Sequence, residues 1–262
     1  MDTAELRDAF LADGIMQPGA INSVYSHYDR IIIGGVKPLS APVLLETQPE
    51  LRADYFLERR EIGIINVGGK GRIEADGETF MLEKLSCLYL GKGTKEVAFF
   101  SVDEADPAAY FFMSAPAHSP YPARLLHKED ASPVALGEPA TSNKRTIYKY
   151  IHLDGIKSCQ LVMGLTVLED GSVWNSVPPH THTRRTEAYF YFDLAEDQRL
   201  FHFMGEPTET RHIVMANHEA VVSPPWSMHY GVGTGSYAFI WAMAGENQVF
   251  TDMDAVAIKD IK

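Results

Sequence analysis

The stretch Pro179-His180-Thr181-His182-Thr183-Arg184-Arg185-Thr186-Glu187 is the part of this chain that best indicates its fold. His180 and His182 are two residues apart, so both imidazoles project from the same face of an extended strand. Glu187 opens the apolar run Glu187-Ala188-Tyr189-Phe190-Tyr191-Phe192-Asp193, which has the composition of a further strand. Tyr189 and Tyr191 share parity with Glu187 and are expected to face the interior of a barrel, whereas Phe190 and Phe192 are expected to pack outward. The sequence therefore predicts a strand, a short basic turn and a second strand that converge on one point.

A fourth donor, His229, follows the segment Ser223-Pro224-Pro225-Trp226-Ser227-Met228 at the edge of a later strand. The predicted metal ligands are His180, His182, Glu187 and His229. Three imidazoles and one carboxylate suit Zn²⁺, and ions of Mn, Fe, Co and Ni use the same donors, so the ligand set alone does not choose the metal. The spacing is similar to that in cupins, which are small antiparallel barrels with a metal inside, although two glycines usual in the cupin pattern are absent.

Length and composition are those of an ordinary globular protein. The 262 residues, 45% of them hydrophobic and 22% charged, can form one large or two smaller domains with a sizeable core. A net charge of −12 argues against nucleic acid as a partner, so an anionic substrate would need locally gathered cations. No apolar leader or membrane-spanning run is evident, and the cytoplasm is the expected location. Cys87 and Cys159 lie in apolar runs and are expected as buried thiols rather than a disulfide.

The pattern along the chain is that of an all-β protein with few short helices. Residues 1–14 predict one short amphipathic helix. Strand-like runs follow at Arg30–Ile33, Glu61–Val67, Cys87–Leu90, Val97–Val102, Tyr110–Met113, Ile147–Tyr150, Gln160–Leu168, Arg199–Met204, Ala220–Ser223 and Tyr237–Ala242. Residues 115–143 are rich in Pro, Ala and Ser and are expected to link two halves.

The two halves resemble each other in sequence. The segment 91–100 aligns with 231–240 and shares two Gly, Thr, Ala and Phe in register. The alignment pairs Glu61 with Glu187, Tyr89 with His229, and Asp54 and Phe56 with His180 and His182. We therefore expect a double cupin of two antiparallel barrel or jelly-roll domains, with a barrel without metal over residues 1–130 and a metal-binding barrel over 131–262.

Several longer motifs carry a more specific resemblance. They are Pro178-Pro179-His180-Thr181-His182, Phe201-His202-Phe203-Met204-Gly205-Glu206-Pro207, Glu209-Thr210-Arg211-His212, Ser223-Pro224-Pro225-Trp226-Ser227 and Trp241-Ala242-Met243-Ala244-Gly245-Glu246-Asn247. Together they resemble the 5-keto-4-deoxyuronate isomerase family, also called 4-deoxy-L-threo-5-hexosulose-uronate ketol-isomerase. The resemblance implies a bicupin, one zinc ion on the four ligands above, a homohexamer and a role in bacterial pectin catabolism. It also implies conversion of 5-dehydro-4-deoxy-D-glucuronate into 3-deoxy-D-glycero-2,5-hexodiulosonate.

The implied reaction suits such a site. Moving a carbonyl from C1 to C2 takes a proton from one carbon and returns one to its neighbour through an enediol, whose negative charge a divalent metal stabilises as a Lewis acid. A hydride shift between the two carbons would use the same metal, and the sequence leaves both routes open. Candidates for acid or base are His202, Glu206, His212 and Tyr189.

Arginine is the expected partner of the substrate carboxylate, because its planar fork matches a carboxylate. Arg211, Arg184 and Arg185 are the candidates, and Arg211 is favoured because it lies in the Glu-Thr-Arg-His motif. Trp226 and Trp241 are interpreted as packing residues. Two other functions remain open at this point: a mononuclear iron cupin dioxygenase, which would require O₂, and a sugar-binding cupin without turnover.

Overall fold

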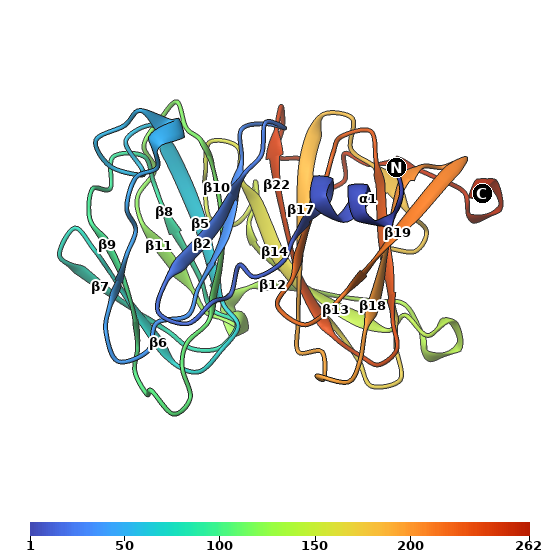
Figure 1. The fold of residues 1–262 in the computed structure, drawn as a ribbon, viewed down its shortest axis with the longest axis horizontal. Helices are drawn as coiled ribbons and strands as arrows, with labels where there is room; N and C mark the ends of the chain where they lie inside the picture. The colour runs from blue at the N-terminus through green and yellow to red at the C-terminus, as the bar shows by residue number, and fades with distance from the viewer. The chain divides into compact units, whose positions relative to one another are not determined.

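The computed structural model describes residues 1–262 and divides them into two compact units of antiparallel strands (Figure 1). The C-terminal unit comprises Met1–Asp13, Ser132–Lys149 and Gly164–Lys262, and the N-terminal unit comprises Gly14–Ala131 and Tyr150–Met163. These units differ in two segments from the expected division into 1–130 and 131–262. The first 13 residues pack with the C-terminal strands because β1 pairs with β20, and residues 150–163 pack within the N-terminal unit.

The C-terminal unit holds two main sheets and a short ribbon. The larger sheet has seven strands in the order β1 (Leu11–Ala12), β20 (Ala220–Ser223), β17 (Arg185–Phe192), β22 (Ala238–Gly245), β14 (Val162–Leu168), β13 (Arg145–Ile151) and β12 (Ser132–Leu136). The smaller sheet has four strands in the order β15 (Trp174–Asn175), β21 (Met228–Gly233), β18 (Leu200–Glu206) and β19 (Glu209–Met215). The ribbon pairs β16 (His180–Thr181) with β23 (Asp254–Ala255).

Strand β17 is the centre of this unit. It pairs with β20 on one side and with β22 on the other, and all eight of its residues are buried. Tyr189 and Tyr191 contact the ring of His202 on β18, whereas Phe190 and Phe192 stack with each other on the opposite face. The predicted alternation of β17 is therefore confirmed, because side chains two residues apart share a face of a strand.

The N-terminal helix is shorter than the sequence predicted. Helix α1 (Thr3–Phe10) begins with a capping box in which Asp2 and Glu5 bond each other's backbone N–H groups. It ends at Phe10, since the next two residues form β1. The rings of Trp226 and Phe10 lie edge to face with their centroids 6.3 Å apart, but Trp226 stays 46% exposed. Trp241 is buried, so the interpretation as packing residues holds for Trp241 and only in part for Trp226.

The N-terminal unit also holds two antiparallel sheets. The larger has six strands in the order β11 (Arg124–Leu126), β8 (Cys87–Leu90), β5 (Arg60–Asn66), β10 (Tyr110–Pro116), β3 (Ile32–Val36) and β2 (Ile21–Tyr25). The smaller has four strands in the order β4 (Val43–Leu44), β9 (Val97–Ser101), β6 (Gly71–Ala75) and β7 (Glu78–Leu82). One continuous apolar core contains side chains of both sheets, so they enclose it between them.

The stretch 115–143 is more than a linker, because it contains the edge strands β11 and β12, paired with β8 and β13. Short 3-10 helices complete the chain: η1 (Pro49–Leu51), η2 (Lys128–Asp130), η3 (Pro139–Thr141) and η4 (Ile258–Asp260). Cys87 and Cys159 are both free thiols, the first buried and the second partly buried. The structure is thus the expected all-β double cupin, with two sheets in each unit.

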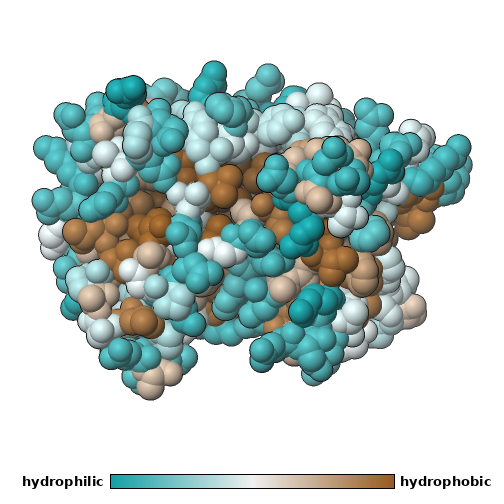
Figure 2. Space-filling view, in the orientation of Figure 1, coloured by the Kyte–Doolittle hydropathy of each residue, from teal (hydrophilic) through white to brown (hydrophobic).

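The surface fits the charged composition. Figure 2 shows a face covered mostly by hydrophilic residues, with smaller hydrophobic patches among them. None of the helices is long and apolar enough to cross a lipid bilayer.

Candidate metal centre

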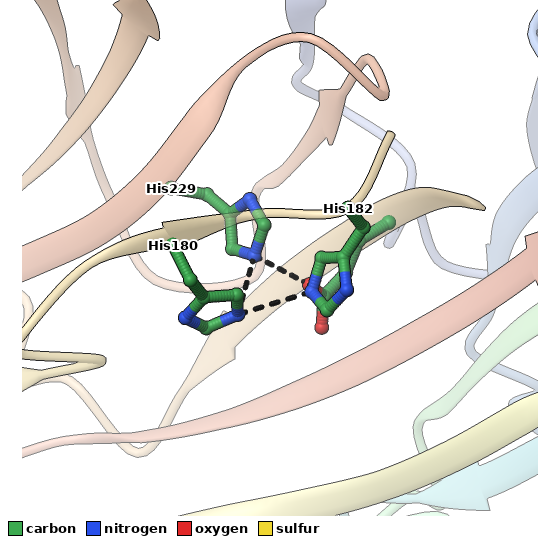
Figure 3. Close-up of side chains that lie close together, drawn as sticks. His180, His182 and His229 are labelled. Atoms are coloured by element: carbon green, nitrogen blue, oxygen red, sulfur yellow. Dashed lines mark hydrogen bonds and ion pairs between the residues drawn. The ribbon is translucent and has the colours of Figure 1, made fainter. Parts of the chain in front are cut away.

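Four side chains from separate segments of the C-terminal unit form a cluster, hereafter the donor cluster: His180, His182, Glu187 and His229. His180 lies on β16, Glu187 on β17 and His229 on β21, while His182 lies in the turn after β16. Their ligand atoms lie within 4.8 Å of one another, and Figure 3 shows the three imidazoles pointing toward a common point. The structure therefore brings together all four residues proposed as ligands.

The distances within the donor cluster match one coordination shell. The Nε2 atom of His180 lies 3.0 Å from Nε2 of His182 and 3.2 Å from Nε2 of His229. Glu187 Oε2 lies 3.0 Å from His182 Nε2 and 2.6 Å from His229 Nε2. A tetrahedral metal with bonds of about 2.0 to 2.1 Å separates its ligands by about 3.3 Å, which is close to three of these four distances, whereas the contact between Glu187 and His229 is shorter.

Backbone carbonyls orient two of the imidazoles. His229 Nδ1 lies 3.3 Å from the carbonyl oxygen of Ser227, and His182 Nδ1 lies 3.1 Å from that of Asp252. An Nδ1–H that donates to a carbonyl leaves the Nε2 lone pair free to face a metal. Arg185 Nη2 donates to the same Asp252 carbonyl at 2.8 Å and so holds the acceptor of the His182 ring in place. With the proton on Nδ1, the 3.0 Å separation of Arg185 Nη2 from His182 Nδ1 joins two donors and is no hydrogen bond.

The buried charge in the donor cluster calls for a cation. Glu187 is 3% exposed, and its Oε2 atom faces the Nε2 atoms of His182 and His229 without the geometry of a hydrogen bond. Burial by itself would raise the pKa of the Glu187 carboxyl, but His229 and His182 beside it hold that pKa well below its usual range. Burial, together with the other two imidazoles, lowers the pKa of His180 to about 3. A divalent ion would pair with the ionised carboxylate and accept the lone pairs of neutral imidazoles, so these residues fit such a metal.

The donor cluster opens onto a cavity of about 230 Å³, hereafter the cluster cavity. Its lining residues are Leu136, Arg145, Ile147, Thr166, Ser176, Val177, Pro178, His180, His182, Glu187, Tyr189, Phe239, Trp241, Met243, Phe250 and Met253. Most of this lining is apolar, with a few polar groups on it, as is usual for small-molecule sites. Gly164 makes room for one wall, since a Cβ there would lie 2.3 Å from the Trp241 ring.

Of the four acid or base candidates, only Tyr189 lines the cluster cavity. Its hydroxyl lies 2.8 Å from Ser176 Oγ, and burial raises its pKa well above the usual value. His202 is buried behind it, where Nδ1 bonds the Tyr191 hydroxyl at 2.8 Å, Nε2 has no partner and burial lowers its pKa to about 3.

The other two acid or base candidates lie away from the cavity. Glu206, at the end of β18, and His212, on β19, are both exposed and do not line it. Neither side chain faces the cluster cavity in this structure, and their role as acid or base stays a prediction. Both lie at the hairpin between β18 and β19, which directs their side chains outward.

None of the three arginine candidates lines the cluster cavity. Arg211 is exposed, forms an ion pair with Glu209 and borders a different cavity beside α1. Arg184 makes ion pairs with Asp252 and Asp254 at 2.6 and 3.0 Å. Arg211, the favoured candidate for the substrate carboxylate, lies on the β18–β19 hairpin, which carries it away from the cluster cavity.

Arg184 and Arg185 instead hold the C-terminal strap, which we define as residues 246–255. Arg185 is fully buried and donates to the carbonyls of Val249 and Asp252 at 2.9 and 2.8 Å. β23, within this strap, pairs with β16, and two strap side chains, Phe250 and Met253, reach the cluster cavity. The only signal of this strap in the sequence is the pair Asp252 and Asp254, whose charges complement Arg184 and Arg185.

The matching position of the N-terminal unit is built differently. Glu61 is fully buried and accepts hydrogen bonds from the Tyr89 hydroxyl at 2.7 Å and from the backbone N–H groups of Cys159, Gln160 and Leu161 at 2.7, 2.9 and 3.0 Å. The predicted correspondence of Tyr89 with His229 agrees with this geometry, since each contacts the aligned glutamate. Here four neutral donors, rather than a cation, solvate the carboxylate.

The fold and the donor cluster define the class of this protein: a double cupin with a candidate metal centre in its C-terminal unit. The chain belongs to the KduI/IolB family, whose model matches residues 21–259.

Individual relatives agree with this assignment. The chain is 53% identical over 260 residues to the 4-deoxy-L-threo-5-hexosulose-uronate ketol-isomerase of Halalkalibacterium halodurans, covering 99% of this chain and 94% of that protein. Its fold is similar to that of an IolB-like protein from Salmonella typhimurium LT2, with a TM-score of 0.69, 16% identity and coverage of 91% and 94%. It is also similar to the oxalate decarboxylase of Lactobacillus farciminis, with a TM-score of 0.60, 10% identity and coverage of 90% and 82%. At such low identity, these two structures support the fold alone.

Proposed function

We propose that this chain is a ketol-isomerase that converts 5-dehydro-4-deoxy-D-glucuronate, which is 4-deoxy-L-threo-5-hexosulose uronate, into 3-deoxy-D-glycero-2,5-hexodiulosonate. The observation that carries the proposal is the donor cluster, which opens onto a cavity in a chain about half identical, over nearly its full length, to relatives of that name. The reaction is an internal redox change: C1 is reduced while C2 of the same molecule is oxidised. It therefore needs no external oxidant.

The donor cluster would hold one Zn²⁺ ion per chain, through three imidazoles and one carboxylate. A bound divalent ion supplies Lewis acid chemistry, which stabilises negative charge that develops on the substrate oxygens. The protein itself fixes the donors: the carbonyl groups of Ser227 and Asp252 orient two imidazoles, and Arg185 holds the Asp252 carbonyl in place. Zinc is the proposed ion because the family resembled by the motifs carries it.

The residues around the cavity suit an enediol route. In this route C2 loses a proton and C1 gains one. The hydroxyl on O2 also loses its proton, and O1 gains one to become a hydroxyl. We assign Tyr189 to hydrogen bonding and proton donation at a substrate oxygen, because its hydroxyl lines the cavity beside Ser176. The apolar walls formed by Phe239, Trp241 and Met243 exclude water and so protect the intermediate.

We also propose that the protein assembles as a homohexamer and works in bacterial pectin catabolism in the cytoplasm. This part of the proposal rests on the resemblance of the motifs to the isomerase family and on an acidic, globular composition. Sedimentation of the purified protein would measure the assembly directly.

Metal analysis combined with an anaerobic assay tests the proposed reaction. We expect about one divalent metal per chain and a product of unchanged mass that forms equally well under argon. His229→Ala should lose most of the metal and the activity, whereas His212→Ala, at an exposed histidine outside the cluster, should keep both. Activity that requires O₂, or full metal content in His229→Ala, would show that the proposal is wrong.

The same assay in D₂O separates the two chemical routes. Proton transfer through an enediol introduces deuterium from solvent at the product carbon that was C1 of the substrate, whereas a hydride shift carries the original hydrogen across. We expect deuterium in the product. A product free of deuterium would keep the isomerase assignment but exclude the enediol route.

A further inference from the structure

The cluster cavity has a single cationic side chain besides the metal donors. Among its lining residues, Arg145 is the only Arg or Lys. It is the first residue of β13, and Ile147, two residues further on, lines the same cavity, so both project from one face of the strand. Arg145 was not among the sequence candidates, because an arginine that begins a strand has the same local pattern whether it faces solvent or a site.

Arg145 differs from the other arginines near the site because no acidic group neutralises it. Its one hydrogen bond runs from NH1 to the carbonyl oxygen of Asn143 at 2.8 Å, and it forms no ion pair. Arg184 is bound to two aspartates, and Arg211 is bound to Glu209. The Nε and NH2 groups of Arg145 therefore remain available for a bound anion.

The surroundings of Arg145 favour an anion. The side chain is partly buried, and burial lowers the pKa of its guanidinium, although an arginine stays protonated near neutral pH. It acts electrostatically on the hydroxyls of Tyr189 and Tyr237, which places it near the inner wall of the cavity. A divalent ion and Arg145 together outweigh the single negative charge of Glu187, so the cavity would be cationic in a chain whose net charge is −12.

We propose that Arg145 binds the carboxylate of the sugar acid and makes the cavity specific for acidic sugars over neutral ones. This proposal rests on the proposed function, since it names the residue that binds the carboxylate end of the substrate, remote from the carbonyl that reacts at the donor cluster. A guanidinium fork pairs with a carboxylate through two parallel hydrogen bonds, which fixes the orientation of the substrate as well as its charge. A neutral sugar would leave the guanidinium without a counterion in a mostly apolar cavity.

Kinetics of two variants test the assignment. Arg145→Gln should raise KM about 100-fold with kcat nearly unchanged, because it removes a charge-assisted pair that binds substrate and transition state alike. Arg145→Lys keeps the charge without the fork and should raise KM about tenfold. Metal content should match the wild type in both. Arg211→Gln is the matched control: it removes an exposed arginine outside the cavity and should leave KM unchanged.

Binding without turnover separates this proposal from the proposed function. Calorimetry of the metal-loaded protein with D-glucuronate and with D-glucose should show tight binding of the acid only, and Arg145→Gln should abolish that preference. If the wild type binds the acid through Arg145 but turns over no substrate, the isomerase assignment fails and the Arg145 assignment stands. Should the wild type turn over substrate while both Arg145 variants keep its KM and its preference for the acid, Arg145 has no such role. Thermal unfolding of each variant shows whether a loss of binding comes from misfolding. If Arg145→Gln fails to fold, the KM and the acid preference of Arg145→Lys decide whether Arg145 binds the carboxylate.

Discussion

Glu61→Gln should destabilise the protein strongly without removing its metal. The Glu61 carboxylate is fully buried in the N-terminal unit and accepts four hydrogen bonds, three of them from backbone N–H groups. Glutamine has nearly the same shape but only one acceptor oxygen, and its NH2 group would face groups that are themselves donors. The substitution therefore tests whether this carboxylate is a structural anion held by the segment 159–161.

The magnitude follows from the individual bonds. If the amide oxygen keeps the N–H groups of Gln160 and Leu161, the N–H of Cys159 loses its acceptor, which costs about 1–3 kcal/mol. The two remaining bonds become neutral, which weakens each by about 1 kcal/mol. The Tyr89 hydroxyl can turn and accept from the new NH2 group, so we count no further loss there. A total of about 3–5 kcal/mol corresponds to a fall in Tm of about 6–20 °C for a chain of this size.

Calorimetric unfolding and elemental analysis, run together on Glu61→Gln and Glu187→Gln, provide the assay. We expect Glu61→Gln to unfold at lower temperature with full metal content, and Glu187→Gln to lose metal, because that carboxylate lies in the donor cluster. A fall in Tm below about 2 °C for Glu61→Gln, or a loss of metal in that variant, would refute the reasoning.

Three further predictions concern the interior. Burial lowers the pKa of His202 to about 3, below its unfolded value near 6.5, so its contribution to stability is full above pH 6.5 and falls at lower pH by up to about 1.4 kcal/mol per unit. Urea unfolding between pH 4 and 7 should be less pH-dependent in His202→Gln, and parallel curves would contradict this. Gly164→Ala should lower the free energy of unfolding by about 1–3 kcal/mol and change the fluorescence of Trp241, since the added Cβ would overlap the indole. An unchanged Tm and emission would show that the indole moves aside at little cost. Cys87 is fully buried, and burial raises the pKa of its thiol, so a thiol reagent followed by mass spectrometry should label at most Cys159 in the folded protein.

Local spacing was enough to find the donors. Imidazoles and carboxylates bind metals through their own chemistry, and His180, His182 and Glu187 lie within eight residues of one another, so a short turn between two strands brings them close. The same local rule predicted correctly that Tyr189 and Tyr191 share a face of β17. His229 could be added to the predicted ligands because it is a histidine like two of them and lies at the edge of an expected strand.

The sequence by itself determined the all-β class, the three cluster donors His180, His182 and Glu187, and the parity of β17, because each depends on residue type and on neighbours a few positions away. Only the tertiary structure decided which arginine faces the cavity. Arg145 lies 42 positions before Glu187, and β13 reaches the cavity because the long-range sheet order is β17, β22, β14, β13. Arg211, though it lies within a diagnostic motif, is carried outward by a hairpin. An arginine has the same chemistry in either place, so its role depends on strand pairings between distant segments, which no local pattern contains.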